Sequence, residues 1–93
     1  MNHHERNITM REAVKKFGVN YEGKYNTSST ALKRYSIEMR KYIPYFSGLT
    51  TQSIYTEKEV EVLRYIKRRT IEGVSIPIAA KDAVSIFYEI VNK

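Results

Sequence analysis

The sequence predicts a small, mainly α-helical domain with four helices and one two-stranded β-hairpin. Three observations support this fold class. The length of 93 residues fits a single domain. The hydrophobic content of 42% is too high for a disordered chain, and four segments repeat their apolar residues with a helical period. We expect residues 1–7 to form a flexible terminus and residues 8–91 to form the folded domain.

The first helix is predicted to begin after Thr9. Thr9 and Glu12 have the spacing of a capping box, in which each side chain bonds the backbone N–H of the other residue. Gly18 supplies the stop signal about two turns later. The apolar residues between them form one helical stripe, namely Met10, Ala13, Val14 and Phe17.

A polar segment, residues 20–28, leads into the second predicted helix. This helix begins near Thr27 or Ser28 and ends by Ile43, because the residue before Pro44 disfavours helical geometry. Its buried face has apolar residues spaced three and four apart, namely Leu32, Tyr35, Met39 and Tyr42. Lys33, Ile37, Arg40 and Lys41 lie away from that face, with Arg34 at its border.

A β-hairpin is predicted within residues 45–55. Its apolar positions are Phe46, Leu49, Ile54 and Tyr55, arranged around a polar tip.

Two further helices complete the predicted fold. Thr56 and Glu59 form a second capping box, and Gly73 ends the third helix. Ser75 caps the fourth helix, whose first turn tolerates Pro77. The basic run at residues 67–69 has two readings, a contact to a nucleic-acid backbone or a complement to the negative end of the helix dipole.

The charge balance predicts an anionic partner. Lys and Arg number 16 against 10 Asp and Glu, which gives a net charge of +6. Residues 1–41 hold nine of the basic and only four of the acidic side chains, so we expect the partner to dock on the first half of the chain. No apolar run is long enough for a membrane span or a signal peptide, which predicts a soluble protein of the cytoplasm.

The side chains do not favour catalysis. The chain has no cysteine, and its two histidines, His3 and His4, lie in the expected flexible terminus. Phosphate-binding loops and known catalytic motifs are absent. We therefore expect no enzyme activity, no metal and no cofactor.

DNA binding explains the sequence better. Two short helices separated by a turn, the second carrying Lys and Arg, are typical of the helix-turn-helix motif. The predicted DNA contacts in the second helix are Ser29, Thr30, Lys33, Arg34, Ile37, Arg40 and Lys41. Outside that helix they are Arg11, Lys24 and the hairpin tip, Thr51, Gln52 and Ser53.

Four segments together resemble the MerR-type winged helix-turn-helix domains. Residues 10–19 (MREAVKKFGV) resemble their first helix, and residues 31–35 (ALKRY) resemble their recognition helix. Residues 55–60 (YTEKEV) resemble the segment after the wing, and residues 73–76 (GVSI) resemble the start of the last helix. The resemblance covers roughly residues 8–85.

This resemblance implies four helices, a two-stranded wing and double-stranded DNA as the partner. It implies that Lys33 and Arg34 contact bases or phosphates and that Tyr35 braces the helix. The chain departs from the family pattern at the inserted residues 20–28 and at Ser53, where an arginine is usual. It also lacks an effector domain, so we expect a short member without a small-molecule effector.

Several roles remain open at this stage. Transcriptional regulation by sequence-specific, nucleoid-associated DNA binding comes first, and DNA segregation (plasmid partition or chromosome anchoring) comes second. A different class is a protein-interaction adaptor that docks an acidic partner. RNA binding is disfavoured because A-form grooves exclude helices. Apolar residues near the end, Phe87, Ile90 and Val91, are expected either to fold back on the core or to form a homo-oligomer contact. In a longer protein this helix would lead into a coiled coil.

Overall fold

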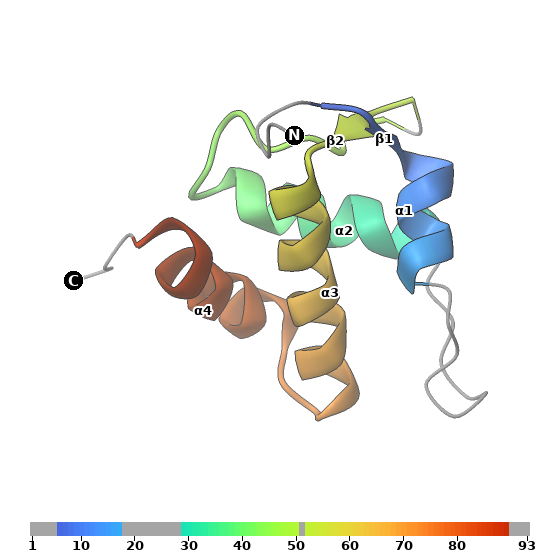
Figure 1. Ribbon diagram of the computed structural model, residues 1–93. Helices are drawn as coiled ribbons and strands as arrows, with labels where there is room; N and C mark the ends of the chain where they lie inside the picture. Colours follow the sequence, from blue (N-terminus) through green and yellow to red (C-terminus); the bar gives the residue numbers. More distant parts are fainter. Residues whose placement is uncertain (1–5, 18–28, 51, 90–93) are drawn as a thin grey trace.

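A computed structural model describes residues 6–17, 29–50 and 52–89. In this part of the chain the elements follow one another as β1 (Ile8–Thr9), α1 (Met10–Phe17), α2 (Ser29–Arg40), β2 (Ile54–Tyr55), α3 (Glu57–Ile71) and α4 (Ile76–Tyr88). In Figure 1, α2 crosses α3, α1 stands beside the start of α2, and α4 lies at the other side of α3. The predicted mainly helical class with four helices is confirmed.

The helix starts lie where local capping signals predict them. Before α1, the Thr9 N–H donates to Glu12 Oε1 at 3.0 Å and the Glu12 N–H donates to Thr9 Oγ1 at 3.1 Å. Thr56 and Glu59 form the same reciprocal pair before α3. At α4, Ser75 Oγ accepts from the Ile78 N–H at 3.4 Å. Each cap bonds N–H groups that have no partner inside the helix.

Helix α2 ends before the limit that Pro44 sets at Ile43. The helix ends at Arg40, and the Tyr42 and Ile43 N–H groups both donate to the carbonyl of Met39, at 3.0 and 2.8 Å. These bonds satisfy the Met39 carbonyl at the end of the helix in a tight turn. The predicted start at Thr27 or Ser28 and the stop at Gly18 lie outside the described residues.

The two-stranded sheet joins residues that are far apart in the sequence. Ile8 pairs with Tyr55 and Thr9 with Ile54 in an antiparallel register. The sequence correctly predicts Ile54 and Tyr55 as a strand but wrongly gives it a partner around Phe46. Phe46 is instead fully buried in the core. Because Phe46 is packed in the core, it is not the strand partner, and β2 pairs with Ile8 and Thr9, which precede α1.

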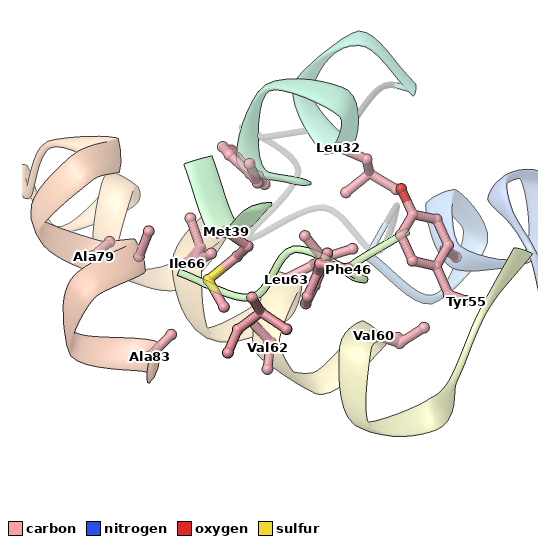
Figure 2. Packing of buried hydrophobic residues seen from close by; sticks show 14 of the residues in the cluster. Leu32, Met39, Phe46, Tyr55, Val60, Val62, Leu63, Ile66, Ala79 and Ala83 are labelled. Carbon is pink, nitrogen blue, oxygen red and sulfur yellow. The ribbon is translucent and has the colours of Figure 1, made fainter. Parts of the chain in front are cut away.

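The core is assembled around α3. Figure 2 shows Phe46 and Leu63 near the middle of the cluster, with Tyr55 on one side and Ala79 and Ala83 on the other. The predicted buried positions of α2 are confirmed for Leu32, Tyr35 and Met39, whereas Tyr42 is half-buried. Small alanines on α4 allow it to approach both α3 and α2 closely.

Two residues of the predicted flexible terminus, Arg6 and Asn7, contact distant parts of the chain. Residues 1–5 lie outside the described part of the chain, but Asn7 donates its N–H to the Tyr55 carbonyl at 3.2 Å. The Arg6 guanidinium forms an ion pair with Glu59 and donates to the Tyr45 carbonyl at 2.9 Å. The sequence does not reveal these contacts because each joins residues more than 35 positions apart.

None of the helices in the described ranges has the length and apolar character that crossing a membrane requires.

Candidate nucleic-acid interface

Helix α2 has one face in the core and one face toward solvent. Leu32, Ser36 and Met39 are buried on the inner side. The opposite side carries Thr30, Lys33, Arg34 and Ile37, and we call these four residues the outer face of α2. Their spacing of three, one and three residues keeps them on a single side of the helix. The predicted exposure is confirmed for Ile37 and Lys41, whereas Lys33 and Arg40 are half-buried and Arg34 is exposed and not at a border.

The outer face carries positive charge that the rest of the domain does not neutralise. Lys33 and Arg34 form no ion pair within residues 6–17, 29–50 and 52–89, and neither does the exposed Arg11 of α1. Lys41 differs, because its Nζ donates to Glu38 Oε1 at 2.8 Å, and this bond with the charge of Glu38 raises the pKa of Lys41. Among the described residues, the cations outside any ion pair therefore include those of α1 and of the outer face of α2, and also Lys81 on α4.

Arg40 has a role within the domain. Its guanidinium is half-buried and donates to the carbonyl of Phe46. This hydrogen bond links the end of α2 to the segment that contains Phe46, whose side chain is buried in the core. Arg40 is thus turned away from the outer face of α2, although the sequence groups it with the DNA contacts.

The basic run in α3 is largely occupied by contacts within the chain. The Arg68 guanidinium lies over the Tyr65 ring, 5.5 Å from its centroid, and Arg69 donates to Glu72 at 2.8 Å. Partial burial lowers the pKa of Lys67. These contacts favour the second of the two readings, a helix end whose cations serve the domain.

The polar segment before β2 forms a turn stabilised by its own hydrogen bonds. The Ser53 N–H donates to the Thr50 carbonyl at 3.1 Å, and Ser53 Oγ accepts from the Thr50 N–H at 3.2 Å. The Gln52 side chain is exposed, so it is a polar group of this turn that a partner can reach. Thr51, predicted as a DNA contact, lies outside the described residues.

A groove runs between the outer face of α2 and the start of α4. Its volume is about 490 Å³, and it is lined by Arg34, Ile37, Glu38, Ser75, Ile76 and Pro77. The sequence gives no sign of this neighbourhood, because only the packing of α4 on α2 brings residues 75–77 beside Arg34.

Some predicted site residues are not brought together or are not described. Lys24 and the Ser29 side chain lie outside the described set, as do Ile90 and Val91 of the predicted oligomer contact. Phe87 packs inside the domain, edge-to-face against Tyr65 with ring centroids 6.0 Å apart. Phe87 therefore contributes to the intramolecular core.

Comparisons of the chain with protein-family models, with curated proteins and with solved structures found no match.

Proposed function

We propose that this chain is a winged helix-turn-helix protein that binds double-stranded DNA in a sequence-specific manner, as a regulator of transcription. The observation that carries the proposal is the outer face of α2. It presents a hydroxyl, an ammonium and a guanidinium to solvent, and no acidic side chain of the described chain pairs with Lys33 or Arg34.

The dimensions of α2 suit the major groove of B-DNA. The groove is about 12 Å wide and admits one helix, and 12 residues of helix span roughly 18 Å along their axis. Arg and Lys donate to the O6 and N7 atoms of guanine, and Thr reaches a base edge or a phosphate. The core contacts of α2 are on its inner side, so we expect its outer face to enter the groove, with the start of α4 beside Arg34 and Ile37.

Two neighbouring elements support the same docking. Helix α1 packs beside α2 and carries Arg11, Lys15 and Lys16 on exposed positions, where they fit a phosphate backbone. Strand β2 and the turn that precedes it take the place of a wing, with β1 from before α1 as the paired strand, and the exposed Gln52 donates to a phosphate without adding charge.

Selection of bound sequences from randomised duplex DNA tests the proposal directly. We expect an enriched site, and we expect the logarithm of affinity to fall linearly with the logarithm of salt concentration. No enrichment, with binding abolished at moderate salt, would contradict the proposal and favour the adaptor that docks an acidic protein. The positions of the enriched site in a genome, near promoters or near partition loci, distinguish regulation from DNA segregation.

Replacing both cations of the outer face identifies the surface that binds. For Lys33→Ala with Arg34→Ala we expect a loss of roughly 30-fold or more in affinity for the selected site, because each base contact contributes about 1–3 kcal/mol. Fluorescence anisotropy with a labelled duplex measures the loss, and thermal unfolding should stay close to that of the unmodified protein.

The matched control is Arg64→Ala with Lys81→Ala, which removes the same charge from exposed positions of α3 and α4. We expect this pair to lower affinity only a few-fold, through the general loss of positive charge. Equal losses in the two double variants would show that net charge alone drives binding and would overturn the assignment of α2.

A further inference from the structure

Ile37 is an exposed apolar residue at the end of the outer face of α2, within one turn of Lys33 and Arg34. Its side chain is 48% exposed, whereas Leu32 and Met39 of the same helix are fully buried. Arg34 precedes it by three residues on the outer face of α2, and Thr30 precedes it by seven. Ile37 lies outside the core cluster, so its side chain is available to a partner that docks on this face.

We propose that Ile37 determines part of the DNA sequence by contacting the 5-methyl group of a thymine, an inference that rests on the DNA binding proposed above. The base edges in the major groove carry one strongly apolar group, the thymine methyl. An isoleucine placed against a donor or acceptor edge removes water from that edge and gives no hydrogen bond in return. Against a thymine methyl it buries apolar surface on both partners.

The surroundings of Ile37 fit this occupant. It adjoins the groove shared with Ile76 and Pro77, so the contact is partly shielded from water. Arg34 lines the same groove, as does Glu38, and Lys33 lies about one turn before Ile37. Lys33 and Arg34 are available for the phosphates and guanines of the same duplex. A β-branched side chain has few χ1 rotamers in a helix, so little side-chain entropy is lost when Ile37 is held against a base.

The helix geometry sets the distance between the two contacted bases. Three residues of α2 advance about 4.5 Å along its axis, and neighbouring base pairs are about 3.4 Å apart. The thymine should therefore lie one or two base pairs from the position contacted by Arg34. A guanine and a thymine at this separation form the expected core of each bound site.

Uracil substitution tests the contact without changing any hydrogen-bonding group. Starting from the duplex enriched by selection, each thymine is replaced in turn by uracil, which lacks only the methyl group. For the unmodified protein we expect one replacement per bound domain to lower affinity about fourfold, the value of one buried methyl-sized group. In Ile37→Ala the same replacement should have no effect, and Ile37→Val should retain part of it.

Ile86→Ala is the matched control. Ile86 is 57% exposed but lies near the end of α4, away from the groove. This variant should show the same uracil sensitivity as the unmodified protein. If a site is enriched but every uracil replacement affects the unmodified protein and Ile37→Ala equally, the thymine contact is overturned and DNA binding stands. Absence of any enriched site would instead overturn the proposed function, and the thymine contact with it.

Discussion

Gly48→Ala should destabilise the domain by about 3–4 kcal/mol, a large part of the stability of a small protein. Gly48 has φ +115°, a conformation that residues with a Cβ rarely adopt. A Cβ built there would lie 2.2 Å from Ser36 Oγ, 2.3 Å from Ser36 Cβ and 2.7 Å from the Tyr55 hydroxyl. Urea denaturation followed by circular dichroism measures the loss of unfolding free energy.

The atoms around Gly48 have no room to move. Ser36 is fully buried on α2, and its Oγ donates to the Leu32 carbonyl at 2.7 Å and lies 3.1 Å from the Tyr55 hydroxyl. Burial raises the pKa of Tyr55, as expected for a phenol without water around it. A methyl group at position 48 must therefore displace α2 or β2, and both displacements disturb the core.

Gly73→Ala provides the matched control. Gly73 also has a left-handed φ, +94°, but a Cβ there meets no atom within 4 Å. Its replacement should lower the unfolding free energy by only about 1 kcal/mol, through backbone strain alone. Equal losses at the two glycines would contradict the steric explanation for Gly48.

Local signals account for what the sequence predicts well. The starts of α1, α3 and α4 are predicted because Thr9, Thr56 and Ser75 cap residues that are only three positions away. The outer face of α2 is predicted because helical periodicity separates it from Leu32 and Met39.

The rest depends on contacts between distant residues. Strand β2 pairs with β1, which precedes α1 in the sequence. This pairing depends on the packing of Phe46 in the core, and the periodicity of the sequence contains no information about that packing. Arg40 looks like a surface cation in the sequence, yet the carbonyl of Phe46 lies within its reach. Gly48 gives only a turn signal, and its close approach to Ser36 appears once α2 and β2 are placed together.

Glu59→Ala should be comparably destabilising, at about 3 kcal/mol, because one carboxylate holds three parts of the chain. Glu59 is only 2% exposed. It accepts from the Thr56 N–H at 3.0 Å and from the Ser47 N–H at 3.1 Å, and it pairs with the Arg6 guanidinium. Truncation leaves the N–H groups of buried Thr56 and half-buried Ser47 without this acceptor, and it removes the ion-pair partner of Arg6. The midpoint of thermal or urea unfolding measures the effect.

Glu12→Ala separates the capping contribution from the buried one. Glu12 occupies the same position in the capping box of α1, and its bonds to Thr9 lower its pKa, but its side chain is exposed. Water replaces the lost carboxylate there, so the unfolding midpoint should shift much less than in Glu59→Ala. If both variants shift the midpoint equally, capping alone explains Glu59 and its bonds to Arg6 and Ser47 add nothing. A larger shift for Glu59 assigns the difference to the link between residue 6, the segment before β2 and α3.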